Sequence, residues 1–292
     1  MKIQHECVPC LFKRIIYESN LSDSDITKKS NAIRAAAASM SKIYDPDICS
    51  ATIATNLHRA VYNALDDPDP YRLLKDRSNT IAKDLLPIVE TLIKQSEDPL
   101  YTSILCAIVG NMLDFGIDGA SSHPEKLLET FEDAVSEGLG YDDYPKVKRL
   151  LRKAHHVMFF TDNCGEIVFD KILCREMKYV FPNVRITLVV KGEPVLSDAT
   201  IKDAMDVGFD TVADEVFTTG CFAVGVDFFR LPPKVSERLK AADIICCKGM
   251  ANYESFSETS YRPIVYLLRT KCKPIAQSMG IPFNINAIKL YQ

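Results

Sequence analysis

The sequence has no apolar run long enough to cross a lipid bilayer, no internal repeat and no low-complexity segment. Its first residues, MKIQHECVPC, lack the long apolar region of a secretion signal. Lysine and arginine never form a run of more than a few residues, and the formal net charge is −4, so a nucleic-acid backbone or an anionic membrane has no basic surface to bind. We expect a cytoplasmic protein that binds neither nucleic acid nor membranes.

The composition is that of a globular protein with a sizeable core. Of the 292 residues, 47% are hydrophobic and 25% are charged, which excludes a disordered or collagen-like chain. The glycine pattern GxGxxG of a dinucleotide site is also missing, because the first predicted strand is followed by DNCGE. Binding of NAD therefore has little support.

Ten cysteines are present, and in a chain of this length without an export signal we expect reduced thiols. Cys7 and Cys10 form a CxxC pair, which is a spacing used by metal and redox sites. A structural zinc site usually needs a second such pair, and Cys246-Cys247 does not have that spacing. Two readings stay open: a metal or redox site, or two thiols that pack at the start of a helix.

The first part of the chain has the spacing of helices. Apolar residues recur every three to four positions after the CxxC pair, and an alanine-rich run follows at 32–40. Further helices are predicted near 47–65, 71–95 and 100–114, between breakers such as Pro46, Pro68 and Pro99. We predict an all-helical N-terminal domain over residues 1–144.

From residue 155 onward the pattern changes to short runs rich in β-branched and aromatic residues. The predicted strands are 157–161, 185–190, 211–217, 244–247 and 264–269, with helical stretches between them. Continuous apolar strands that alternate with helices indicate a parallel sheet covered on both faces. We predict a Rossmann-like, doubly wound, mostly parallel α/β domain over residues 145–292, with the junction near 142–146.

Polar residues follow several of these strands, and ligands of open α/β sheets bind beyond the carboxyl ends of the strands. Asp162 and Asn163 follow the first strand, Asp198 follows the second, and Lys248 ends the fourth. Carboxylate and amide oxygens suit a hard divalent cation such as Mg²⁺ or Mn²⁺, and a lysine suits a phosphate. The pattern favours a metal-dependent phosphoryl site over Asx-turns and helix caps, which would explain any one of these residues alone.

Other readings of the same residues remain. Asp162 is either a metal ligand or a nucleophile that forms an aspartyl-phosphate, and its neighbours Asn163 and Asp198 favour the ligand role. Asn111 and Asp114 lie one helical turn apart and either enter a cleft between the domains or, with Gly116 as a C-cap, face solvent. The rival functions are an S-adenosylmethionine-dependent methyltransferase and a CxxC metal or redox module.

Five motifs in this order resemble the domain-of-unknown-function 89 family, and the CxxC resembles its archaeal and bacterial subgroup. They are CxxC at 7–10, GNxxDFG at 110–116, DNxGE at 162–166, SDAT at 197–200 and KGxxNYE at 248–254. The resemblance implies a damage-control phosphatase that uses Mn²⁺, Mg²⁺, Ni²⁺ or Co²⁺ to hydrolyse phosphate esters of small metabolites, such as sugar phosphates, nucleotides or cofactor intermediates.

The resemblance also implies roles for individual residues. Asp162, Asn163 and Asp198 match metal ligands, and Lys248 matches a phosphate-contacting lysine. Three further residues match positions in the cleft motifs and are expected to bind substrate: Asn111, Glu166 and Asn252. Cys164 stands where related motifs often have a small residue, so contact between its thiol and the metal stays open. Neither the physiological substrate nor the oligomeric state follows from these motifs.

Overall fold

The computed structural model describes residues 1–113 and 131–292, and the strands of this part of the chain form one seven-stranded sheet. Its order is β1-β7-β6-β5-β2-β3-β4, and every pairing is parallel except that of β6 with β7. The strands are β1 (Tyr141–Asp142), β2 (His156–Phe160), β3 (Arg185–Val190), β4 (Glu215–Thr218), β5 (Ile244–Lys248), β6 (Ile264–Arg269) and β7 (Asn286–Tyr291).

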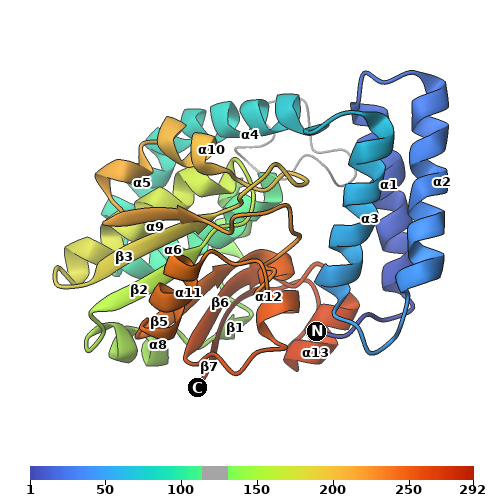
Figure 1. Ribbon diagram of the computed structural model, residues 1–292. Helices are drawn as coiled ribbons and strands as arrows, with labels where there is room; N and C mark the ends of the chain where they lie inside the picture. The colour runs from blue at the N-terminus through green and yellow to red at the C-terminus, as the bar shows by residue number, and fades with distance from the viewer. Residues whose placement is uncertain (114–130) are drawn as a thin grey trace.

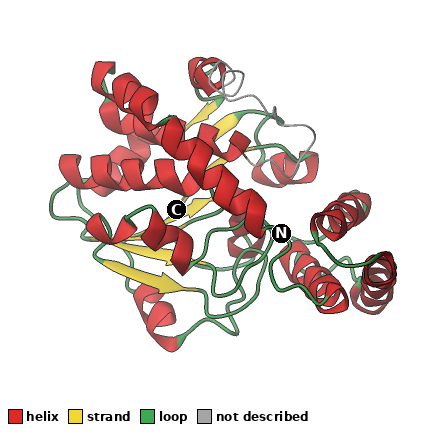
Figure 2. Cartoon of the chain, turned by 90° about the horizontal axis from the view of Figure 1, so that it is seen from above, coloured by secondary structure: helices red, strands yellow, loops and turns green. Residues whose placement is uncertain are grey.

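Helices lie on both sides of the sheet (Figures 1 and 2). They are α1 (Cys7–Leu21), α2 (Ile26–Ile43), α3 (Ser50–Leu65), α4 (Arg72–Asp84), α5 (Leu86–Gln95), α6 (Pro99–Val109), α8 (Tyr144–Leu151), α9 (Glu166–Val180), α10 (Ile201–Asp206), α11 (Pro233–Lys240), α12 (Gly249–Phe256) and α13 (Lys273–Met279), with short 3₁₀ helices η1 (Gly110–Leu113) and η2 (Phe209–Thr211).

The two faces of the sheet are buried by different helices. On one face, α5, α6, α8 and α9 pack against Val157 and Phe159 of β2. On the other face, α11, α12 and α13 pack against Met158 and Phe160 of the same strand. Successive strand residues point to opposite faces, so a strand that is apolar at every position needs both layers. The predicted doubly wound, mostly parallel α/β fold is confirmed.

The first three helices form a bundle beside the sheet (Figure 1). They enclose a hydrophobic cluster of their own, with Ile15, Ala36 and Leu57 at its centre. Val195 and Phe222, from loops beyond the carboxyl ends of the strands, pack on the same cluster. The bundle therefore rests against the end of the sheet where a ligand site is expected.

The predicted segments 1–144 and 145–292 share hydrophobic contacts. Ile104 of α6 and Val157 of β2 lie in one buried cluster, so the helices next to the boundary cover the sheet. The division into two domains at residue 144 stays a prediction. Helices α1–α3 are the part of the first segment that packs mainly with itself.

Some predicted elements differ from those observed. The helix predicted over 71–95 is two helices, because Pro87, which lacks an N–H, lies in the first turn of the second one. The strand predicted over 211–217 begins only at Glu215, after a 3₁₀ turn that starts at Gly208 in the left-handed conformation. The short strand β1 and the antiparallel strand β7 were not predicted.

The described part of the chain contains no helix with the length and apolar character needed to span a bilayer.

Candidate active site

The site lies at the point where the strand order of the sheet reverses. From β2 the chain continues to β3 and β4 on one side, and then returns to β5 and β6 on the other side of β2. The loop after β2 carries Asp162, and the neighbouring strand β5 ends at Lys248, directly before Gly249, the first residue of α12. Such a reversal opens a crevice between the two loops, which is where α/β proteins bind ligands.

The crevice brings the backbone of Gly249 against the carboxylate of Asp162. A Cβ atom added to Gly249 would lie only 1.9 Å from Asp162 Oδ2. Gly249 also has φ +72°, a left-handed conformation that side chains disfavour. Both the contact and the conformation require glycine at this position of the KGxxNYE motif.

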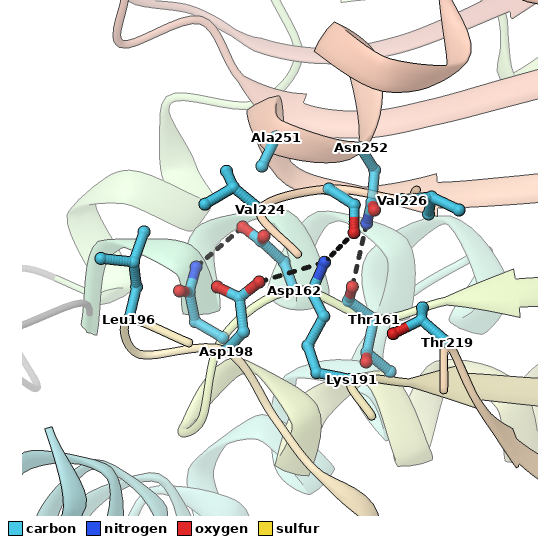
Figure 3. Close-up of polar contacts among 12 residues, drawn as sticks. Thr161, Asp162, Lys191, Leu196, Asp198, Thr219, Val224, Val226, Ala251 and Asn252 are labelled. Atoms are coloured by element: carbon cyan, nitrogen blue, oxygen red, sulfur yellow. Dashed lines mark hydrogen bonds and ion pairs between the residues drawn. The ribbon is translucent and has the colours of Figure 1, made fainter. Parts of the chain in front are cut away.

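The three predicted metal ligands come together in one cluster, and Figure 3 shows Asp162 and Asp198 side by side in it. Asn163 Nδ2 donates to Asp162 Oδ2 at 2.8 Å, and Asn163 forms an isolated β-bridge with Asp198. The Asn163 Oδ1 atom accepts a bond from the hydroxyl of Ser197 at 2.7 Å, and the N–H of Ala199 donates to the backbone oxygen of Asp162 at 2.8 Å. The DNxGE and SDAT motifs are thus held in register by side-chain and backbone hydrogen bonds.

The carboxylates of this cluster are buried among other charges. Asp162 and Asp198 are 7% and 4% exposed. Burial, followed by the negative charges of Asp198 and Glu166, raises the pKa of the Asp162 carboxyl well above its usual range, although Lys191 and Lys248 oppose the effect. A bound cation would relieve this repulsion between carboxylates.

Lys191, which follows β3, supplies a positive charge inside the cluster. Its ammonium lies 3.2 Å from Asp198 Oδ2 and donates a hydrogen bond to the carbonyl of Gly225 (Figure 3). The lysine is 3% exposed. Lys191 was not among the residues predicted to form the site. Its position directly after a parallel strand was the signal that could have identified it.

Lys248 lies in a second, deeper cluster below the rim. Its ammonium is completely buried and donates to the carbonyl of Ala107 at 3.0 Å, to Glu166 Oε1, and to Asp170 Oδ1 at 2.6 Å. These three bonds occupy all of its donors. The structure therefore places Lys248 next to Glu166, and not on the surface of the crevice.

The deeper cluster combines two carboxyl groups with one ammonium. Burial lowers the pKa of Lys248, but Asp170 and Glu166 outweigh it and raise that pKa above its usual value. Burial also raises the pKa of Asp170 to about 7, because its effect is larger than the opposing effect of the Lys248 ammonium, which Asp170 shares with Glu166. Asp170 was not predicted; its spacing of one helical turn from Glu166 on α9 was the available signal.

Asn111 joins the two clusters. Its Nδ2 donates to Asp162 Oδ2 at 3.0 Å and to Glu166 Oε2 at 2.6 Å. Lys271 in turn donates to Asn111 Oδ1 at 2.8 Å and to the Asn111 carbonyl at 2.6 Å. The predicted approach of Asn111 to the site is therefore observed, whereas its predicted neighbour Asp114 lies outside the described residues.

Asn252 brings α12 to the same place. Its Nδ2 donates to the carbonyls of Thr161 at 2.9 Å and Lys248 at 2.8 Å. Its Oδ1 is buried and has no hydrogen-bond partner within the described part of the chain. A buried amide oxygen without a partner costs free energy, and a ligand or cation would offset that cost.

The helical bundle fixes the loops of the site. The hydroxyl of Tyr62 on α3 accepts the Leu196 N–H at 3.0 Å, and Thr55 of the same helix accepts the Val224 N–H at 2.9 Å. From α4, the side-chain oxygen of Asn79 accepts the N–H of Gly165 at 2.7 Å. The N-terminal helices therefore position the DNxGE and SDAT loops.

We call Asp162, Asn163, Asp198 and Lys191 the upper cluster. Its oxygen donors suit a hard cation that the protein coordinates only in part. Among residues 1–113 and 131–292, no three His, Cys, Asp or Glu side chains converge as a metal site. Two carboxylates and amide oxygens leave coordination positions for water and substrate, as catalytic Mg²⁺ sites do. The donor set suits Mg²⁺ or Mn²⁺ better than a soft metal.

Cys164 directly follows Asn163 in the DNxGE loop, whereas Cys7 and Cys10 lie on α1 of the helical bundle. All ten are free thiols. Cys7 is half-buried and Cys10 is exposed, both in the first turn of α1, where burial raises the pKa of the Cys7 thiol. Cys164 is buried, which together with the negative charge of Asp203 raises its pKa well above the usual value. A metal or redox role of Cys7 and Cys10 stays a prediction.

Comparisons with known proteins cover nearly the whole chain. A sequence model of the damage-control phosphatase ARMT1-like domain matches residues 3–283. A damage-control phosphatase of Archaeoglobus fulgidus is 37% identical over 96% of both chains. The damage-control phosphatase PH1575 of Pyrococcus horikoshii is 29% identical over 97% of this chain and 96% of its own.

A solved structure supports the same assignment. The crystal structure of a DUF89 family protein from Pyrococcus horikoshii covers all of both chains with a TM-score of 0.91 at 26% identity. The resemblance inferred from the five motifs is thereby confirmed, while membership of the CxxC subgroup stays a prediction. The chain belongs to the family of damage-control phosphatases with an ARMT1-like domain.

Proposed function

We propose that this protein is a metal-dependent phosphatase that hydrolyses phosphomonoesters of small metabolites and so removes damaged or surplus compounds. Family membership supports phosphatase activity. The observation that carries the metal dependence is the convergence of Asp162, Asn163 and Asp198 at the reversal point of the sheet. The proposed substrates are sugar phosphates, nucleotides or cofactor intermediates.

The proposed metal is Mn²⁺, Mg²⁺, Ni²⁺ or Co²⁺, held by Asp162, Asp198 and the amide of Asn163. When bound, such a cation polarises a phosphate ester and balances the charge that develops as the bond to the leaving group breaks. The unpartnered Oδ1 of Asn252 is a further oxygen that a ligand at this site would satisfy.

The residues of the chain orient and confine the reaction. Asn111 fixes Asp162 and Glu166 relative to each other through two hydrogen bonds. The bare backbone of Gly249 leaves room for the carboxylate of Asp162. We retain Asp162 as a metal ligand in preference to a nucleophile, because Asn163 and Asp198 accompany it. Substrate binding by Asn111, Glu166, Asn252 and Asp114 stays part of the proposal.

A role for Lys248 in direct contact with the phosphate was predicted from the sequence and stays a prediction. Its three filled hydrogen bonds support a different contribution, in which the ammonium holds the Glu166 carboxylate in place. Glu166 then accepts the amide of Asn111, which also contacts Asp162.

The proposal also covers the partners and the location of the protein. A phosphatase of metabolites works on small phosphorylated molecules, and a cytoplasmic location without nucleic-acid or membrane partners is consistent with the acidic net charge of −4.

The test is a hydrolysis screen over sugar phosphates, nucleotides and p-nitrophenyl phosphate, with each of the four metals and with a chelator. We expect hydrolysis that requires a divalent metal and is lost in Asp162→Ala. Asp206→Ala is the matched control, because it removes an exposed carboxylate paired with Lys202 at 2.7 Å. Full metal-dependent activity in a folded Asp162→Ala protein would contradict the assignment.

A further inference from the structure

The ammonium of Lys191 is a positive charge at the predicted metal site that the sequence motifs leave without a role. It contacts the carboxylate of Asp198 at 3.2 Å and the carbonyl of Gly225, so it faces the same cluster as Asp162 (Figure 3). The contact with Gly225 is a hydrogen bond and the contact with Asp198 is an ion pair, so these partners take at most two of its three N–H groups. Within the described part of the chain no third partner contacts the ammonium, which leaves one N–H for a ligand.

Lys191 is held rigidly in this position. Its backbone N–H donates to the carbonyl of Ala199 at 2.9 Å, and the N–H of Gly192 donates to the hydroxyl of Thr219 at 3.0 Å. A Cβ atom on Gly192 would lie 2.3 Å from the backbone nitrogen of Cys221, so this loop is closely packed. A lysine fixed at both ends loses little entropy when it binds an anion.

The charges of the site also favour this lysine over Lys248. Asp162 and Asp198 carry two negative charges when ionised, and a divalent cation only neutralises them. Lys191 then leaves the upper cluster with one positive charge, which strengthens its attraction for a phosphate dianion. Lys248 adds nothing to that balance, because Glu166 and Asp170 surround it and all its donors are filled.

We infer that Lys191 is the catalytic residue that binds the phosphate group of the substrate, with its third N–H directed at a non-bridging oxygen. The inference rests on the proposed function, because it takes the substrate to be a phosphate ester beside a cation held by Asp162 and Asp198. It also implies that the charge of Lys191 repels that cation, so that the lysine favours phosphate and disfavours metal.

If Lys191 binds phosphate, its removal should weaken phosphate binding without weakening metal binding, whereas a merely structural lysine would affect both. The experiment measures two affinities by isothermal titration calorimetry: Mn²⁺ alone, and inorganic phosphate in the presence of saturating Mn²⁺. The variants are Lys191→Met, Lys191→Gln and Lys191→Arg. The matched control is Lys178→Gln, which removes a lysine paired with Asp214 at 3.0 Å in the last turn of α9, the end of that helix away from Glu166.

We expect Lys191→Met to bind inorganic phosphate about 10- to 100-fold more weakly, since a charge-assisted hydrogen bond in a buried site is lost. Its affinity for Mn²⁺ should be unchanged or higher by up to about 10-fold, because a repelling charge has been removed. Lys191→Arg should retain most of the phosphate affinity, and Lys178→Gln should leave both affinities unchanged.

Two results would overturn the inference. Phosphate affinity within about threefold of wild type in Lys191→Met would show that the lysine does not bind the anion. A parallel loss of Mn²⁺ affinity would show that Lys191 only orients Asp198. If the methionine variant fails to fold, Lys191→Gln carries the same comparison, because its amide can still donate to Gly225. A wild-type protein that binds no Mn²⁺ and hydrolyses no phosphomonoester would instead contradict the proposed function itself.

Discussion

Replacing Lys248 with methionine tests what the buried cluster contributes to the fold. Methionine has a similar length but no charge, so Glu166 and Asp170 lose the ammonium that both contact. All three side chains are at most 1% exposed. Removing one partner of a buried ion pair leaves an uncompensated charge and costs about 3–5 kcal/mol. We expect Lys248→Met to lower the free energy of unfolding by this amount at pH 8.

The loss should be smaller at lower pH. In the wild-type protein Asp170 releases its proton near pH 7, since its pKa is about 7. Without the lysine the carboxyl keeps its proton to higher pH, so the variant continues to lose stability above pH 7 where the wild type no longer does. The difference between the two proteins should therefore grow by about 1 kcal/mol between pH 6 and pH 8.

Urea unfolding of both proteins at pH 6 and pH 8, followed by circular dichroism, measures these quantities. Lys178→Gln is the control, because it removes a lysine from a partly exposed ion pair, where little stability is lost. A loss below about 1 kcal/mol at pH 8, combined with a large loss of catalytic efficiency, would refute this reasoning. That result would support direct contact between Lys248 and the phosphate.

Two further predictions concern neighbouring residues. Gly249→Ala places a methyl group against the carboxylate of Asp162, so metal-dependent hydrolysis should fall at least about 100-fold. Gly280→Ala is the control, because Gly280 also has a left-handed backbone, with φ +66°, but has open space around it. It should keep its activity in the same assay, which separates the steric clash with Asp162 from backbone strain. Asp170→Asn removes a carboxyl whose pKa is raised in the folded protein to about 7. This carboxyl stabilises the fold fully at pH values below its pKa in the unfolded chain, and the stabilisation is lost as the pH rises through about 7. The stability of the wild type relative to Asp170→Asn should therefore fall by about 3 kcal/mol from pH 5 to pH 8 in urea unfolding, and a constant difference would contradict the buried-carboxyl account.

The local pattern of the sequence predicted the strands that carry the site. The run 185–190 matches β3 in full, and β2 and β5 differ from their predictions by a residue at the ends. These strands are apolar at most positions because both faces are covered, which gives a strong signal. Since parallel strands share one carboxyl edge, the motifs after β2 and β3 could be placed together before the structure was known.

Elements without that signal were missed. Strand β7 carries Lys289 and only half-buried residues near its end, and β1 has two residues, so neither forms an apolar run. Pro87 divides a helical pattern that otherwise continues from α4 into α5. In each case pairing or backbone chemistry decided the structure, and the spacing of apolar residues did not.

The orientation of the two lysines also could not be read from spacing. Lys248 bonds to residues 141, 82 and 78 positions away in the chain, and no local pattern encodes these contacts. Its place at the end of β5 predicted an exposed rim, but α6 and α9 cover it. Lys191 directly follows β3, on the other side of β2 from β5, and its ammonium does face the predicted metal ligand Asp198.

We propose that Asp162, Asn163 and Asp198 hold the divalent cation that phosphate binding requires. The decisive measurement is a titration of Mn²⁺ into the wild-type protein and into Asp162→Ala, each followed by inorganic phosphate. We expect one Mn²⁺ site in the wild type and phosphate binding that depends on the metal, with both lost in a folded Asp162→Ala protein. Unchanged Mn²⁺ affinity in that variant would contradict the claim and would place the metal elsewhere.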